Sequence, residues 1–155
     1  MANQLGLTPH QVDIKGAYLN GILREDKILY MQHPPSYKAS DAGKHILWLQ
    51  KALYGLKKAG CHWYQTFSSI LSLLSFAQCS VDQAIYHKMS AAAGKLIVIA
   101  VHVDGCTIAA SWLCLIEDFK ASLSKHVEVT DLGELHWMLS IEVKQEHAAG
   151  TIHLS

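Results

Sequence analysis

The segment from Leu96 to Ala109 constrains the fold of this chain more than any other. It is an apolar run rich in β-branched residues that stops at Asp104-Gly105 and then resumes as a second, shorter apolar run. Asp-Gly between two such runs is a strong signal of a tight β-hairpin, because a type I′ turn needs positive φ at both central residues. The segment therefore predicts two buried, paired strands with the carboxylate of Asp104 at their exposed end. That carboxylate is either part of the turn chemistry or a metal ligand.

Composition is typical of a globular protein of one domain. Of the 155 residues, 50% are hydrophobic and 17% are charged, and a chain of this length buries about 70% of the surface that its unfolded form exposes. The formal net charge is zero. The chain therefore lacks the overall basic character of many nucleic-acid-binding proteins, although a neutral protein can still carry a local basic groove.

The cysteines and the first residues predict an intracellular protein, in the cytoplasm or nucleus. The first residues lack the basic and apolar regions of a secretory signal peptide. No apolar run approaches the ~18–20 residues that cross a bilayer, so no membrane association is expected. Four cysteines without CxxC spacing predict free thiols in a reducing compartment: Cys61, Cys79, Cys106 and Cys114.

Strand and helix signals alternate along the chain. Period-2 and apolar runs predict strands at residues 11–14, 28–31, 45–49, 83–89, 96–103, 137–145 and 151–154. Apolar residues at spacings of three and four predict helices at residues 63–76 and 112–124. Asn20-Gly21 and the loop at residues 34–43 carry turn signals. This order favours an α+β domain with one antiparallel sheet and two helices on one face, for which the ferredoxin-like split βαβ is the natural candidate.

Two groupings of polar residues around the expected hairpin could carry chemistry. His102, Asp104 and Cys106 alternate along one stretch, but same-face residues of a strand lie about 6.6–6.8 Å apart, which is too far for a nucleophile and its base. A core cysteine beside a turn is the better interpretation of Cys106. Asp13 is an acid within the apolar strand Val12-Asp13-Ile14, either on a solvated face or beside Asp104. Two carboxylates at one sheet edge can hold Mg²⁺ for phosphoryl transfer.

Five stretches, taken in order, resemble the reverse transcriptase of Ty1/copia-type LTR retrotransposons. They are HQVDIKGAYLNG at residues 10–21, ILYMQHP at 28–34, ALYGLKKA at 52–59, VHVDG at 101–105 and TDLGEL at 130–135. The resemblance implies a polymerase palm in which Asp13 and Asp104 are the catalytic metal ligands for Mg²⁺ or Mn²⁺. It also implies RNA or DNA template-primer and dNTP as partners. The nucleotide-binding residues would be Tyr18, which would discriminate the sugar, with Tyr54, Gly55 and Lys57.

Several positions depart from the family pattern. Gly105 stands where the family's Tyr-Val-Asp-Asp box has its second aspartate, and His102 replaces the tyrosine of that box. Gly60-Cys61 replaces Pro-Arg, and Ser140 replaces a glycine. The missing carboxylate should weaken metal binding and reduce activity severely.

We therefore expect residues 1–155 to form a single truncated palm domain, without fingers, thumb or ribonuclease H. Its expected function is that of an RNA-directed DNA polymerase palm that is degenerate, with weak activity or none, so its status as an enzyme stays open. A residually active fragment using Asp13 and Asp104 is one alternative. The other is a non-catalytic module that binds nucleic acid or protein, because palm surface left uncovered favours self-association or a partner.

Overall fold

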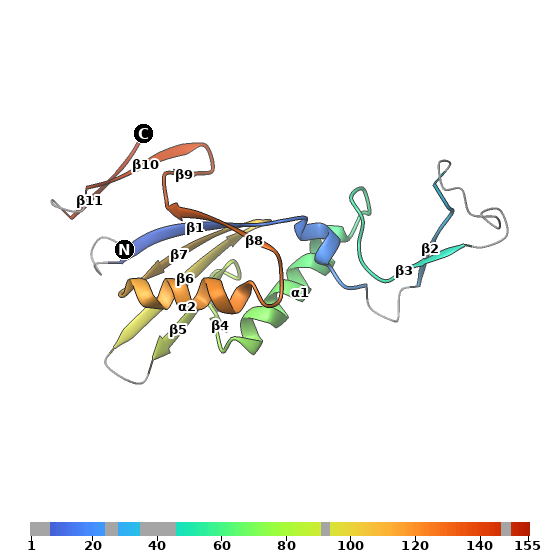
Figure 1. Cartoon of the computed structure of the whole chain (residues 1–155), viewed down its shortest axis with the longest axis horizontal. Coiled ribbons are helices and arrows are strands. Elements are labelled where there is room, and N and C mark those ends of the chain that lie inside the picture. Colours follow the sequence, from blue (N-terminus) through green and yellow to red (C-terminus); the bar gives the residue numbers. More distant parts are fainter. Residues whose placement is uncertain (1–6, 24–27, 35–45, 91–93, 147–149) are drawn as a thin grey trace. The chain divides into compact units, whose positions relative to one another are not determined.

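The protein is a mixed α+β structure with antiparallel sheets, as the sequence predicted (Figure 1). The computed structural model describes residues 7–23, 28–34, 46–90, 94–146 and 150–155. Contacts divide the chain into two compact units. Unit 1 comprises Met1–Lys15 and Ser69–Ser155, and unit 2 comprises Gly16–Ser68. The single palm domain therefore stays a prediction, and each unit is described by itself.

Unit 1 contains a six-stranded sheet with the order β4-β5-β6-β7-β1-β8, in which every neighbouring pair is antiparallel. Its strands are β1 (Thr8–Ile14), β4 (Ala77–Gln78), β5 (Ile85–Ser90), β6 (Lys95–His102), β7 (Gly105–Ala110) and β8 (Val129–Glu134). The central strand β7 shows why the sequence folds this way, because Cys106, Ile108 and Ala110 alternate as buried residues along it. The sequence did not predict β4 and β8.

Helix α2 (Leu113–Leu123) covers one face of this sheet and packs on β7, β1 and β8. Its buried residues Ile116, Phe119 and Leu123 recur at spacings of three and four, which places them on one stripe of the helix. The ring of Phe119 meets that of Phe76 edge-on, with the centroids 5.2 Å apart. The predicted helix at residues 112–124 is thus confirmed. That both helices cover the same face stays a prediction.

A smaller sheet of unit 1 has the order β11-β10-β9. Its strands are β9 (Trp137–Met138), β10 (Ile141–Glu146) and β11 (Thr151–Leu154). The predicted continuous strand at residues 137–145 is wrong, because the chain reverses at Leu139 and Ser140, where φ is 52° and 66°. The Gln145 side chain ties β10 to the chain of the main sheet, since its amide donates to the carbonyl oxygens of Pro9 and Leu135, both at 3.1 Å.

Unit 2 contains the 3-10 helix η2 (Ala17–Asn20), the hairpin of β2 (Leu29–Met31) and β3 (Leu47–Leu49), and the first part of helix α1 (Ala59–Leu73). The remainder of α1 belongs to unit 1. One hydrophobic cluster of unit 2 contains the buried residues Leu23, Ala52 and Ala59, against which Tyr18, Leu49 and Leu56 pack. Trp63 and Phe67, on the part of α1 that belongs to unit 2, are also buried.

Gly21 ends η2, where its N–H donates to the carbonyl oxygen of Tyr18 at 3.1 Å, so the chain turns at Asn20-Gly21 as the sequence predicted. Its φ of −63° is open to any residue, so conformational freedom does not explain the glycine. A Cβ at this position would lie 2.8 Å from the backbone nitrogen of Trp63 and 3.1 Å from the carbonyl carbon of His62. Gly21 therefore permits close approach of the chain to helix α1.

Most of the predicted loop at residues 34–43 lies outside the described residues, as do residues 91–93 and 147–149, each between two predicted strands. In the described part of the chain, no helix is long and apolar enough to cross a membrane. All four cysteines are free thiols, as predicted.

Candidate active site

Asp104 lies in the two-residue turn that joins β6 to β7. The predicted hairpin is present, but its turn is centred on Val103-Asp104 and not on Asp104-Gly105. Gly105 opens β7, where it pairs with His102. The positive φ of the turn falls on Val103, at 56°, a conformation that costs an L-residue about 1–2 kcal/mol. Asp104 is exposed at the tip.

Asp13 lies near the end of β1, beside this turn. Strand pairing places Asp13 directly opposite Gly105. One residue further on, the N–H of Ile14 donates to the carbonyl oxygen of Asp104 at 2.8 Å. The β1–β7 ladder therefore brings the two predicted carboxylate residues, Asp13 and Asp104, to the same end of the sheet.

The thiol of Cys106 is buried at this end of the sheet, and its pKa is strongly raised. Cys106 is 1% exposed, and its pKa is raised to about 12, chiefly by burial and then by the negative charges of Asp13 and Asp104. A thiol with so high a pKa is not a nucleophile at neutral pH. The interpretation of Cys106 as a core cysteine is confirmed.

Gly105 occupies the position at which the family pattern led us to expect a third carboxylate. Its φ lies outside the left-handed region, and a Cβ there would meet only the carbonyl oxygen of His102, at an ordinary contact distance of 3.6 Å. Directly opposed residues of an antiparallel pair have Cβ atoms about 4.5–5.5 Å apart and lie on the same face of the sheet. A side chain at position 105 would therefore stand beside Asp13 without backbone strain.

The donor set suits one divalent cation. Mg²⁺ is commonly bound through one or two protein carboxylates, with water and substrate phosphates completing its shell. Asp13 and Asp104 supply two such carboxylates. No group of three or more His, Cys, Asp or Glu side chains suited to a metal occurs in the described ranges. The two residues therefore match the number of protein carboxylates that Mg²⁺ commonly takes.

The four predicted nucleotide-binding residues all belong to unit 2. The rings of Tyr18 and Tyr54 are brought together, with centroids 5.8 Å apart and planes inclined by 59°. Gly55 follows directly in a turn with φ of 88°, where a side chain would be strained. Lys57 is exposed. These residues thus combine an aromatic pair with a nearby solvent-facing cation.

The sequence did not predict that Asp131-Leu132-Gly133 forms a β-bulge. The pairing of β1 with β8 shifts register at Leu132, and Gly133 has φ of 74°, as in a β-bulge closed by a glycine. The Asp131 carboxylate accepts the Gly133 N–H at 2.9 Å and the Lys120 ammonium of α2 at 2.5 Å. The hydrogen bond from Lys120 is the main cause of the lowered pKa of Asp131. An aspartate two residues before a glycine could have predicted this bulge, because an aspartate side chain often accepts the N–H of the second residue after it.

The comparison with known protein families decides what kind of domain carries these residues. The sequence profile of a family described as "Reverse transcriptase (RNA-dependent DNA polymerase)" matches residues 1–155. The chain belongs to this reverse transcriptase family. The predicted resemblance is thereby confirmed along the whole chain.

Relatives of this reverse transcriptase domain are Pol polyproteins of Ty1/copia-type transposons. It is 30% identical over 155 residues to the Retrovirus-related Pol polyprotein from transposon TNT 1-94 of Nicotiana tabacum, covering 100% of this chain and 11% of that protein. It is 34% identical over 146 residues to the corresponding polyprotein from transposon RE1 of Arabidopsis thaliana, covering 94% and 10%. The chain thus spans about a tenth of the length of these relatives. No solved structure matches it.

Proposed function

We propose that the chain is the palm of a Ty1/copia-type reverse transcriptase, acting inside the cell, whose RNA-directed DNA polymerase activity is weak or lost. The observation that carries this proposal is the pairing of Asp13 with Gly105. Two carboxylate residues remain at the end of the sheet, and a glycine stands at the neighbouring position. The family membership and the sheet geometry support the ancestry, and Gly105 supports the loss of activity.

The strand order supports a ferredoxin-like split βαβ arrangement for this palm. Four neighbouring strands of the main sheet have the order β6-β7-β1-β8, all antiparallel. Along the chain α1 lies between β1 and β6, and α2 lies between β7 and β8. A β-α-β-β-α-β unit with a strand inserted between the two parallel strands of each crossover is the split βαβ pattern.

In the proposed reaction Asp13 and Asp104 would hold Mg²⁺ or Mn²⁺ beside the triphosphate of a dNTP. When bound, the ion would stabilise the charge that develops on the transferring phosphoryl group. Asp13 is fixed by its strand, whereas Asp104 depends on the turn at Val103. For unit 2, taken by itself, the family resemblance makes Tyr18 the residue that discriminates the sugar and makes Tyr54, Gly55 and Lys57 nucleotide-binding residues. With only two carboxylates, metal binding and catalysis should both be weak.

Primer extension on an RNA template with a DNA primer tests this proposal, in Mg²⁺ and in Mn²⁺. We expect extension by the native chain near background, and at least a tenfold gain for Gly105→Asp. Gly105→Asn is the matched control, since it adds the same volume without a charge and should give no gain. Robust extension by the native chain that Asp13→Asn abolishes would contradict the proposed loss of activity. Equal rates for the native chain and Gly105→Asp would contradict the role of position 105.

A second candidate function is supported by the β2–β3 hairpin of unit 2. Tyr30 and Trp48 are directly opposed across its strands, and they are 61% and 57% exposed. Stacking of bases on exposed aromatic rings is worth about 1–3 kcal/mol per base and tolerates any sequence. The hairpin could therefore contribute to a non-catalytic module that binds nucleic acid.

Tryptophan fluorescence tests this second function. We expect an RNA–DNA hybrid or single-stranded RNA to quench emission in a salt-dependent manner. Trp48→Phe should remove most of the quenching signal and keep binding in a gel-shift assay, and the double variant Tyr30→Ala with Trp48→Ala should weaken binding about tenfold or more. Trp112→Phe, an exposed tryptophan of unit 1, is the matched control. Binding unchanged in the double variant would exclude the hairpin as the contact surface.

A further inference from the structure

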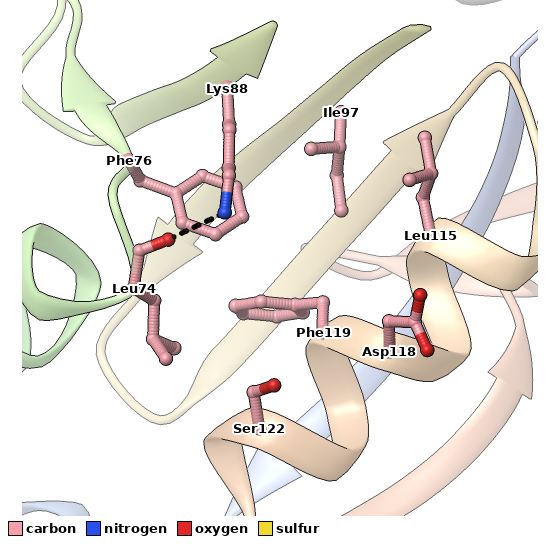
Figure 2. Close-up of a pocket in the computed structure, with 8 residues that line it drawn as sticks. All are labelled: Leu74, Phe76, Lys88, Ile97, Leu115, Asp118, Phe119 and Ser122. Carbon is pink, nitrogen blue, oxygen red and sulfur yellow. Dashed lines mark hydrogen bonds between the residues drawn. The ribbon is translucent and has the colours of Figure 1, made fainter. Parts of the chain in front are cut away.

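A pocket lies within unit 1, between helix α2, strands β5 and β6, and the segment that follows α1 (Figure 2). Its volume is about 190 Å³. Buried side chains form its floor and half-buried or exposed side chains form its rim. The floor is made by Phe76, Ile97 and Phe119, and the rim by Leu74, Lys88, Leu115, Asp118 and Ser122. The pocket is therefore apolar inside and polar at its mouth, as small-molecule sites commonly are.

The pocket is separate from the candidate active site. Ile97 is near the start of β6, whereas His102 ends that strand at the turn of Asp104. Five residues of strand span about 17 Å. Occupation of the pocket is thus independent of metal binding at Asp13 and Asp104, and the inference extends beyond the proposed polymerase function.

The one cation at the rim is already engaged. The ammonium of Lys88 donates to the carbonyl oxygen of Leu74 at 2.9 Å and lies 5.6 Å from the centroid of the Phe76 ring. Figure 2 shows this side chain directed across the ring to Leu74. The aromatic floor thus already accepts one ammonium, while Lys88 is not available as a partner for an anionic ligand.

The polar groups of α2 at the rim are unengaged. Asp118 and Ser122 are four residues apart, so they lie on the same side of the helix as Leu115 and Phe119. Among the described residues, neither the carboxylate of Asp118 nor the hydroxyl of Ser122 has a hydrogen-bond or ion-pair partner. The pocket therefore offers two acceptors, one of them negatively charged, above an aromatic floor.

We propose that this pocket binds a small apolar amine, an aryl or short alkyl group bearing one ammonium. The apolar body would pack on Phe76, Ile97 and Phe119, and the ammonium would bind the acceptors of Asp118 and Ser122. The volume fits this class, because an apolar cavity of about 150 Å³ accommodates benzene. The charge fits it too, because an ammonium beside the carboxylate of Asp118 is attracted by it, and the ring of Phe119 adds to that attraction. The ring of Phe76 already holds the ammonium of Lys88 and adds none.

Amide chemical shifts of the full 155-residue chain test the proposal, with benzylamine as the probe and benzyl alcohol and benzoate as ligands of similar size. We expect saturable shifts for residues of the pocket at about millimolar benzylamine, which is typical of so small a ligand. Benzyl alcohol should bind about three- to tenfold more weakly than benzylamine, and benzoate more weakly still. Equal or tighter binding of either reference ligand would overturn the choice of an amine.

Two variants locate the site. Asp118→Asn should weaken benzylamine about two- to fivefold and leave benzyl alcohol unchanged. Glu117→Gln is the matched control, since it removes the same charge from the same helix at a residue that does not line the pocket. Ser122→Leu should fill the mouth and abolish shifts from both ligands in a chain whose spectrum remains dispersed. Equal effects of Asp118→Asn and Glu117→Gln, or full binding in Ser122→Leu, would overturn the proposal.

Discussion

The carboxylate of Asp131 connects strand β8 with helix α2 and, through Lys120, with strand β1. It lies on β8, caps the N–H of Gly133 within the bulge, and holds Lys120 of α2. The Lys120 ammonium also lies 3.3 Å from Nδ1 of His10 on β1. Burial and the charge of Lys120 together lower the pKa of His10. The irregular pairing at one sheet edge is therefore fixed to the helix that covers the sheet.

We predict that Asp131→Asn lowers the free energy of unfolding by about 0.5–1 kcal/mol at neutral pH, because the pair is partly exposed and its charge attraction is screened. Asparagine can still accept the Gly133 N–H, so Asp131→Ala should cost more. The pKa of Asp131 is lowered on folding from 3.8. Its contribution is therefore complete above pH 3.8 and is lost as the pH falls through the folded-state pKa.

Urea denaturation at pH 7 and at pH 3 and below measures this difference. Asp118→Asn is the control, since its carboxylate has no partner in the described part of the chain, and it should change stability by less than about 0.5 kcal/mol. A difference between the native chain and Asp131→Asn that is equally large at low pH would contradict an ionic contribution.

At the scale of elements, two glycines near helix α1 differ in how much space they leave for a side chain. Gly21 lies against the backbone of α1, where the nearest atom to a Cβ would be only 2.8 Å away. Gly60 lies within the first turn of α1, where a Cβ would meet the ring of Tyr18 at 3.6 Å. The first site has no room for a methyl group, and the second does.

We predict opposite effects for alanine at these two positions. Gly21→Ala should destabilise unit 2 by about 1–3 kcal/mol, because two backbones must separate. Gly60→Ala should be neutral or stabilising by up to about 1 kcal/mol, because alanine is the better helix former. Thermal unfolding followed by far-UV circular dichroism compares them. A stable Gly21→Ala variant would show that the close approach is not required.

The sequence predicted most helices and strands, but it did not predict where the chain reverses between some of the strands. The apolar, β-branched run sufficed to predict β6, and apolar residues at spacings of three and four sufficed to predict α2. The Asp-Gly signal placed the hairpin turn one residue too late, since Gly105 is held in the ladder by His102 and Asp13 together. The turn at Leu139 and Ser140 contains no glycine, because Ser140 stands where the family pattern has one, so the local turn signal was weak.

At the scale of the whole molecule, the sequence predicted the two carboxylates of the candidate site but not the pocket of unit 1. Asp13 and Asp104 were predicted from motif resemblance, and their shared sheet end follows from strand pairing. The amine pocket could not be predicted, because it is lined by side chains from four segments separated in the sequence. Contacts of that kind depend on tertiary packing and leave no local pattern.

We predict that the two units differ in local stability. Strands β6 and β7 of unit 1 carry buried side chains, whereas no side chain of β2 or β3 in unit 2 is buried. Native-state hydrogen exchange should therefore show faster opening of amides in β2 and β3 than in β6 and β7, by about a hundredfold or more. Gly21→Ala should accelerate the first set alone. Equal protection throughout, lost together, would indicate one cooperative unit.

The pairing of Asp13 with Gly105 has a consequence for the history of such a chain. The backbone at position 105 admits a side chain without rearrangement, and His102 offers no obstacle at 3.6 Å. Codons for glycine and aspartate can differ by a single base. If the proposed loss of activity holds, a single base change at this codon would restore a carboxylate beside Asp13 without any rearrangement of the surrounding backbone.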